Sequence, residues 1–368
     1  MMEKSIHHND IPLESMSSDR QMESIYRGRS LRKLLLLILL LILLIITAGA
    51  AITKGSATVP LQELWAMMTG AGADEMNVYI VREVRLPRVL MSVVTGISLA
   101  AAGTIMQALL RNPLADPFTL GVSSGAAFGA ALAIVAGTSV FGMNLVHSGP
   151  WLIAFNAFLF GCLAVGVVYG IARMKNSSTT VLLLAGVAIG QLFSAGVSAL
   201  KYFSNNDALK DLIIWLMGGF WGSGWHVLEI LLPLSAFALL VLMKYAWDLN
   251  ALISGEEVAL TLGVKVKHIR WVCLVTVTLL ASTTIAFTGI IGFIGLVAPH
   301  ISRMIIGTDY RYLLPCSCLI GALLLLTSDT VARLLLTPIE IPVGIVTSFF
   351  GAPFFIYLLV KKRREYWT

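Results

Sequence analysis

Residues 117–174 read PFTLGVSSGAAFGAALAIVAGTSVFGMNLVHSGPWLIAFNAFLFGCLAVGVVYGIARM, and this stretch decides the fold class of the 368-residue chain. Its only Asp, Glu, Lys or Arg is Arg173, close to its end. About 20 apolar residues, each rising about 1.5 Å along a helix, cross the hydrocarbon layer of a membrane. The stretch is therefore too long for one membrane helix. The turn-forming residues 137–150 divide it into two.

Further apolar segments lie on both sides of this stretch. They cover residues 34–53, 89–110, 176–200, 227–247, 271–302, 312–328 and 341–360. The run from Trp271 divides near residues 288–292 and leaves a short helix ending around Ile306, which brings the count to ten. The chain is 57% hydrophobic and 12% charged, whereas soluble domains carry about 25% charged residues. We expect an all-α, polytopic membrane bundle of about ten helices over residues 31–364, preceded by a disordered cytoplasmic tail at residues 1–30.

Small residues recur at helical spacing within these segments. Gly121, Gly125 and Gly129 form one such series, and the pairs Gly166/Gly170 and Gly186/Gly190 repeat the spacing. Glycine lets a neighbouring helix backbone approach closely, so the pattern predicts tight helix packing. Four cysteines, Cys162, Cys273, Cys316 and Cys318, also fall within the membrane segments. We interpret them as packing residues, because the further ligands of a metal site are lacking.

The positive charges predict the orientation of the bundle. With the N-terminus inside, the inner segments hold 19 of the 26 Lys and Arg residues. Cytoplasmic loops are enriched in these residues, so we expect a multi-pass protein of the cytoplasmic membrane with both termini in the cytoplasm. The formal net charge of +6 then reflects orientation and contact with anionic lipid rather than nucleic-acid binding.

A polar insert at residues 244–270 separates two apolar segments and reads KYAWDLNALISGEEVALTLGVKVKHIR. We expect Ser254 to cap a short helix that runs to Leu262, with Glu256 and Glu257 in its first turn and Gly263 as its stop. Two membrane helices do not need a helix-forming insert merely to be joined. The insert therefore indicates contact with a soluble protein, and the alternative is a solvated connecting loop.

Several ordered motifs resemble one family of transport proteins. They are RLPR (85–88), MQALLRNPLADPFTLGVSSGA (106–126), LLLAGVAIG (182–190), WLMGGFWG (215–222), ALISGEEVALTLGV (251–264), TGIIGFIGLVAPHISR (288–303) and SDTVARLLLTPIEIPVGIVTSFFGAPFFIYLL (328–359). Over residues 84–359 the chain resembles the FecCD-type permease subunits of bacterial and archaeal ATP-binding-cassette (ABC) importers for ferric siderophores, haem and vitamin B12.

The resemblance implies a type II ABC importer permease fold with ten membrane helices per copy. It implies a homodimer, or a dimer with a close paralogue, with the transport pathway between the two copies. Two ATP-binding subunits would dock from inside, and an extracytoplasmic substrate-binding protein would deliver cargo from outside. ATP would be used by the partner, and this chain would hold no cofactor, metal or catalytic residue. A ferric siderophore is the expected cargo, with vitamin B12 or haem as alternatives.

The resemblance also assigns roles to particular residues. Residues 248–268 become the coupling segment that contacts the ATPase, through Ser254, Gly255, Glu256, Glu257, Leu260, Leu262 and Gly263. Arg85, Arg88 and Arg333 become docking residues for the binding protein, although arginines at helix ends also snorkel to the membrane interface without such a role. Asn112, Leu114, Thr179 and Thr180 become the cytoplasmic gate, with simple helix capping as the alternative.

The sequence also allows a comparison with two other classes of function, an intramembrane protease and an ion-coupled transporter. The sequence GVSSG (121–125) fits the G-x-S-x-G pattern of serine hydrolases, with His300 or His147 as a base for an intramembrane protease. The same glycines explain helix packing, however, and no strand is expected before the serine. An ion-coupled secondary transporter usually places ionisable residues near the membrane midplane. The membrane segments between residues 89 and 172 offer no acidic or basic residue for such coupling. The chain also lacks any Gly-Lys dipeptide, and so lacks a phosphate-binding loop of its own.

Overall fold

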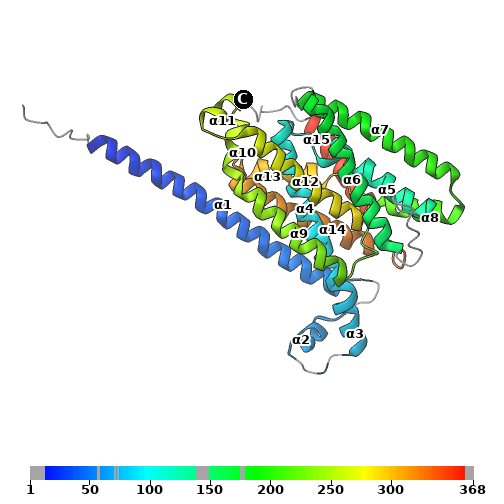
Figure 1. Cartoon of the computed structure of the whole chain (residues 1–368). Coiled ribbons are helices and arrows are strands. Elements are labelled where there is room, and N and C mark those ends of the chain that lie inside the picture. Colours follow the sequence, from blue (N-terminus) through cyan, green and yellow to red (C-terminus); the bar gives the residue numbers. More distant parts are fainter. Residues whose placement is uncertain are drawn as a thin grey trace, which may run out of the picture.

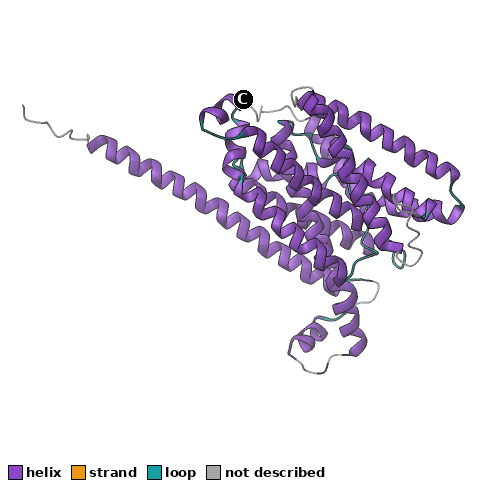
Figure 2. Cartoon of the chain, in the orientation of Figure 1, coloured by secondary structure: helices purple, strands orange, loops and turns teal. Residues whose placement is uncertain are grey.

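The computed structural model describes residues 13–55, 59–69, 72, 74–137, 149–174 and 179–360, and every regular element within these residues is helical (Figure 2). The elements in chain order are α1 (Leu13–Thr53), α2 (Leu61–Thr69), α3 (Glu75–Tyr79), the π-helical turn η1 (Ile80–Arg85), α4 (Leu86–Leu110), the 3-10 turn η2 (Pro117–Leu120), α5 (Val122–Ala136), α6 (Gly149–Met174), α7 (Thr179–Phe203), α8 (Asn206–Met217), α9 (Trp225–Lys244), α10 (Ala246–Ile253), α11 (Glu256–Thr261), α12 (Val266–Thr288), α13 (Ile294–Ile306), α14 (Tyr310–Leu334) and α15 (Val343–Val360). The all-α prediction is confirmed.

The membrane helices match the predicted segments. Seven described helices are long and apolar enough to cross a membrane, and the shorter apolar helices α5, α13 and α15 bring the set to ten. The long apolar run at residues 117–174 is divided as expected, because α5 ends at Ala136 and α6 begins at Gly149. The next predicted division is also present, between Thr288 at the end of α12 and Ile294 at the start of α13.

Helix α1 is longer than the sequence patterns indicated. Residues 13–30, for which composition predicted a disordered tail, belong to this helix, and residues 1–12 lie outside the described residues. The chain has no proline between Leu13 and Pro60, so nothing in the sequence ends the helix before the apolar segment begins. Figure 1 shows α1 running past the bundle. Helices α2 and α3 lie at one end of the bundle, and α10 and α11 lie at the other end.

Helix α4 lies at the centre of the bundle and α7 at its edge. In the most apolar stretch of the segment that contains α4, 83% of the residues are buried inside the chain. In the most apolar stretch of α7, only 17% of the residues are buried. Glycines bring α4 against its neighbours: a Cβ atom built on Gly103 would lie 1.9 Å from the Gly295 carbonyl oxygen of α13. Only glycine permits this approach. The predicted role of Gly125 and Gly129 is confirmed, since both lie directly against the α6 backbone. For Gly166 and Gly170 it is wrong, because both face open space.

Helix ends meet inside the bundle where α8, α12 and α15 begin or stop. The backbone N–H of Gly219 donates to the Thr288 carbonyl at 2.8 Å, and that of Gly344 donates to the Gly218 carbonyl at 3.5 Å. Gly218 has φ +68°, and a Cβ atom there would lie 2.4 Å from the Ile290 carbonyl oxygen. These contacts fix the inner end of α8, a short helix that the search for apolar segments did not predict.

Candidate functional site

The coupling segment (residues 248–268) folds as two short helices rather than one. Helix α10 ends at Ile253, and the Ser254 hydroxyl donates back to the Asn250 carbonyl at 3.2 Å. Gly255, with φ +137°, is the residue that precedes α11. The prediction that Ser254 caps the second helix is therefore wrong, because its hydroxyl is used to close α10.

Gly263 ends α11 as predicted. It has φ +79°, and its N–H donates to the Leu260 carbonyl at 3.0 Å while the N–H of Val264 donates to the Ala259 carbonyl at 2.9 Å. This pair of bonds is the Schellman arrangement, which needs a left-handed residue at the position of Gly263. Glu256, in the first turn, forms an ion pair with Arg270 at 2.9 Å.

The face of α11 that points away from the bundle is apolar and exposed. Val258, Leu260 and Leu262 are 43%, 58% and 68% exposed, whereas Ala259 between them is fully buried against the bundle. Three neighbouring exposed apolar side chains on a short polar loop indicate a contact surface rather than a solvated connection.

Polar contacts tie the coupling segment to the rest of the bundle. The Asn250 amide donates from Nδ2 to Asp309 Oδ1 at 2.8 Å and accepts from the Tyr310 backbone N–H at 2.8 Å. The Arg311 guanidinium forms an ion pair with Asp309 and lies 3.9 Å from the centre of the Trp247 ring. Helix α10 is therefore joined to the start of α14.

Charge reinforces this junction. Burial acts to raise the pKa of Asp309, but hydrogen bonds from Arg311 and Asn250 outweigh it and hold the pKa below its ordinary value. On the other side of the segment, Arg111 Nη2 donates to the Leu252 carbonyl at 2.9 Å. The sequence patterns missed Asn250 and Asp309, because their two positions are 59 residues apart.

The predicted gate residues occupy two separate elements. Asn112 and Leu114 lie in the loop after α4, where Asn112 Oδ1 accepts from the Leu114 N–H at 2.9 Å. Thr179 and Thr180 form the first turn of α7, and Thr180 is exposed. Asn112 thus forms a hydrogen bond within its own turn. Leu114 remains 37% exposed.

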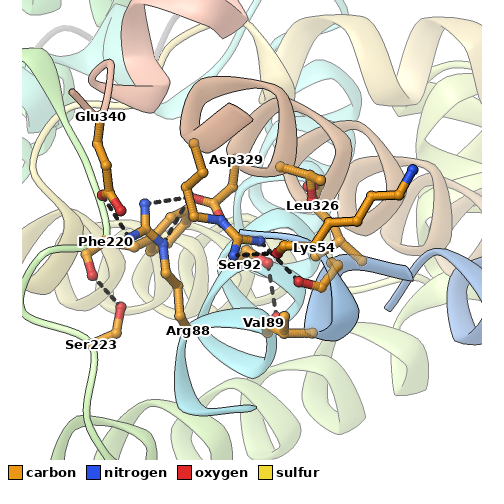
Figure 3. Close-up of polar contacts among 12 residues, drawn as sticks. Lys54, Arg88, Val89, Ser92, Phe220, Ser223, Leu326, Asp329 and Glu340 are labelled. Carbon is orange, nitrogen blue, oxygen red and sulfur yellow. Dashed lines mark hydrogen bonds and ion pairs between the residues drawn. The ribbon is translucent and has the colours of Figure 1, made fainter. Parts of the chain in front are cut away.

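At the opposite end of the bundle, charged residues from η1, α4, α14 and the loop after α14 meet in what we call the arginine cluster: Arg85, Arg88, Arg333, Asp329 and Glu340. Arg88 lies between the two carboxylates, 3.0 Å from Asp329 Oδ1 and 2.8 Å from Glu340 Oε2 (Figure 3). Arg333 Nε pairs with Asp329 Oδ2 at 3.1 Å across one helical turn.

The same cluster holds the end of α1. Arg85 Nη1 donates to the carbonyls of Ile52 and Thr53 at 2.7 and 3.1 Å. Arg333 also reaches this helix end, with Nη1 at 3.5 Å from the Lys54 carbonyl oxygen. Cations stabilise a helix C-terminus, where carbonyl groups lack intrahelical partners.

The three arginines predicted to face a binding protein are thus engaged inside the chain. Arg85 and Arg333 are only 5% and 6% exposed, and the side chain of Arg88 is 13% exposed. Sequence patterns placed them at helix ends but could not show the buried partners, because Asp329 is 241 residues away from Arg88.

The serine motif of the rival protease interpretation lies in a helical context. Ser123 and Ser124 lie in the first turn of α5, which follows a 3-10 turn and not a strand. His300 lies in α13, and His147 lies outside the described residues. Among these residues no group of three or more His, Cys, Asp or Glu side chains could hold a metal ion.

The architecture defines a class: a polytopic membrane protein of apolar helices with an exposed apolar helix face at one end. The chain belongs to the FecCD transport family, whose sequence model matches residues 37–361. Members of this family are permease subunits of ABC importers, which work with ATPase and binding-protein partners and are not themselves enzymes.

Individual relatives extend the match over most of the chain. The hemin transport system permease protein HmuU of Yersinia pestis is 40% identical and covers 84% of this chain and 91% of its own length. The cobalamin import system permease protein BtuC of Halobacterium salinarum is 39% identical over 84% of each chain. A solved ABC transporter structure in an inward-facing conformation, assigned to the metal-chelate type, has a TM-score of 0.78 and 34% identity and covers 89% of this chain and 99% of its own.

Proposed function

We propose that this chain is the permease subunit of an importer that carries a ferric chelate across the cytoplasmic membrane, driven by ATP hydrolysis on partner subunits. The similarity to a hemin permease and to a metal-chelate type transporter supports a ferric cargo, a siderophore or haem. The similarity to a cobalamin permease keeps vitamin B12 as the alternative cargo. The permease itself holds no cofactor.

The exposed apolar face of α11 is the observation that carries this proposal. Val258, Leu260 and Leu262 insert into the ATPase subunit, while Gly255 and Gly263 set the bounds of the inserted helix. Closure of the ATPase pair then moves α10 and α11, and the Asn250–Asp309 contact passes the movement to α14.

A second copy, or a close paralogue, covers the α7 face. Helix α1 exposes only aliphatic side chains over its membrane segment, which suits lipid. Helix α7 instead exposes Gln191, Ser194 and Ser198 beside Leu184 and Val187. Lipid cannot satisfy hydroxyl and amide groups, so the mixed face favours a protein partner and a wet pathway between the copies.

The gate and the orientation follow from the same arrangement. Both termini lie in the cytoplasm, together with the coupling segment. Asn112 and Leu114 then stand at the cytoplasmic end of the pathway, with Thr179 and Thr180 at the start of α7. Two ATP-binding subunits dock at this end, one on each copy.

The binding protein docks at the arginine cluster at the other end. Acidic side chains of that protein take over Arg88 from Glu340, which is 35% exposed and the more exposed of its two carboxylate partners. Exposed ion pairs contribute about 0 to 1 kcal/mol each, so Arg88 sets docking register and rate more than affinity. Arg85 and Arg333 are buried and hold the cluster in place from inside the chain.

The proposal is tested by uptake into proteoliposomes that contain the complete importer. Labelled ferric chelate or cobalamin should accumulate only with ATP, and uptake should persist when the proton gradient is dissipated. Leu260→Asp should abolish ATP-driven uptake by burying a charge in the ATPase contact, whereas the matched change Leu184→Asp on α7 should leave ATPase association intact. Uptake that survives ATP depletion and collapses with the proton gradient would show an ion-coupled carrier instead.

A further inference from the structure

A pocket lies between α5, α7 and α8, outside the sites described above. Its volume is about 280 Å³. The lining residues are Ser123, Ser124, Ala127, Ser194, Val197, Ser198, Lys201, Leu216 and Ile290. We call it the serine pocket. Its size is at the lower end for small-molecule sites, so it holds one arm of a larger ligand rather than the whole.

One wall of the pocket is polar and carries a single charge. Ser194 Oγ donates to Ser124 Oγ at 3.4 Å, and Ser198 Oγ donates to the Ser194 carbonyl at 3.0 Å. Lys201 lies one turn beyond Ser198 on α7 and is the only charged residue among those that line the pocket. Hydroxyl groups can donate to or accept from a ligand, whereas an ammonium group only donates. The electrostatic preference of the wall is therefore for anionic oxygen.

The other wall is apolar and fixed. Val197 and Ala127 are buried, and Ile290 belongs to the junction where Gly218 meets the Ile290 carbonyl. Gly196 lets α7 approach α5 closely, since a Cβ atom there would lie 2.6 Å from Phe128 Cε2. The hydroxyl wall is thus held in place by packing, and Ser194 and Ser198 remain exposed at its mouth on the α7 face.

We propose that the serine pocket binds an anionic oxygen-donor arm of the cargo, a carboxylate or α-hydroxycarboxylate group of a ferric chelate, during its passage. Lys201 supplies the charge, and the hydroxyls of Ser194 and Ser198 supply hydrogen bonds. This inference rests on the proposed function, because it places the α7 face on the transport pathway. It names the class of chelate that the pathway favours: acidic chelates over neutral ones.

A thiol-reaction experiment tests the charge preference without any cargo. Ser194→Cys in the complete importer, in membrane vesicles, is reacted with anionic sulfonatoethyl and cationic trimethylammonium-ethyl methanethiosulfonate. Adding Lys201→Gln should lower the anionic-to-cationic rate ratio about fourfold. Lys201 lies seven residues, about 10 Å, along α7 from Ser194. One unit charge at that distance in a water-like medium changes each rate about twofold, in opposite directions for the two reagents. Lys201→Arg should retain the ratio. The importer without the new cysteine gives the background from the four native cysteines.

Trp65→Cys is the matched control, because Trp65 is 68% exposed and lies on α2, away from the pocket. The ratio of the two reagents' rates at this position should not respond to Lys201→Gln. A ratio that also stays constant in the Ser194→Cys importer would overturn the proposal. So would a fall of equal size at both positions.

An uptake experiment then tests the cargo class. Lys201→Gln should reduce ATP-driven uptake of anionic ferric citrate several-fold more than that of a neutral ferric trihydroxamate. Equal effects on the two chelates, or wild-type uptake confined to neutral cargo, would overturn the assignment. If the wild-type importer carries no chelate and no cobalamin, the proposed function fails, while the thiol ratios still report whether the pocket favours anions.

Discussion

Single buried carboxylates have different consequences in this chain, depending on their partners. The buried Asp329 and the partly buried Asp309 are paired with arginines. Asp116, in the loop before α5, has only backbone partners among the described residues: its carboxylate accepts from the Thr119 N–H at 3.1 Å. Burial raises the pKa of Asp116 to about 6, although the N–H groups of Thr119 and Phe118 act to lower it.

Asp116→Asn should remove this pH dependence. The folded chain binds the Asp116 proton more tightly than the unfolded chain, so its contribution to stability is complete below about pH 4 and is lost as the pH rises through about 6. The amide keeps an acceptor for the Thr119 N–H but carries no charge. We expect the variant to be more stable than wild type at pH 8, by up to about 3 kcal/mol, and equally stable at pH 4. Thermal unfolding in detergent at both pH values measures this. A variant less stable at pH 8 would contradict it.

Asp329 should be the residue whose loss damages the arginine cluster most. It is fully buried and pairs with both Arg88 and Arg333. Asp329→Asn leaves two guanidinium groups without that charge, and breaking a buried ion pair costs about 3 to 5 kcal/mol.

Glu340→Gln is the matched control for Asp329→Asn. Glu340 is partly exposed and touches only Arg88 among the three arginines. It should cost less than about 1 kcal/mol. Equal melting temperatures for the two variants would show that the cluster is not held by Asp329.

At the scale of elements, the crossing of α4 with α13 depends on two facing glycines. Gly103→Ala places a methyl group inside the Gly295 backbone, so the helices must separate. We expect little folded protein, as judged by size-exclusion chromatography. Gly166→Ala on α6 makes the same chemical change in open space and should be neutral or should stabilise by up to about 1 kcal/mol, because alanine favours helix. Similar yields for both variants would contradict the packing account.

The junction of α10 with α14 should govern coupling more than assembly. Asn250→Ala removes both hydrogen bonds to the start of α14 but leaves the exposed face of α11 unchanged. We expect normal ATPase association and ATP hydrolysis, with uptake per ATP reduced about tenfold, since each lost hydrogen bond costs about 0.5 to 1.5 kcal/mol. Thr69→Ala on α2, whose hydroxyl bonds only within its own helix, is the comparison, and its ratio of uptake to hydrolysis should stay at the wild-type value. An unchanged ratio of uptake to hydrolysis would remove Asn250 from the coupling route.

At the scale of the whole molecule, the sequence predicts the membrane helices well, because apolar length and turn residues are local signals. The ten segments, the division at residues 137–150 and the stop at Gly263 all follow from such signals. The sequence patterns did not predict the extension of α1 to Leu13, because the polar composition of residues 13–30 is typical of a disordered segment. The two helices of the coupling segment were also missed, since Ser254 closes the first helix instead of opening the second.

The candidate sites were less predictable than the helices. Arginines at helix ends can be recognised in a sequence, but their partners on distant helices cannot. Only the structure therefore shows that Arg85 and Arg333 are buried. The serine pocket is the same kind of feature, because α5, α7 and α8 contribute to it from separate parts of the chain.

The central claim is that the coupling segment lies in the cytoplasm and is bound there by the ATPase subunit. The most direct measurement uses Leu262→Cys, whose position is 68% exposed, and a membrane-impermeant maleimide. We predict labelling in inside-out vesicles stripped of ATPase subunits, little labelling in right-side-out vesicles, and protection when the ATPase subunits are added back. Labelling from the outside, or labelling that the ATPase does not block, would contradict the account.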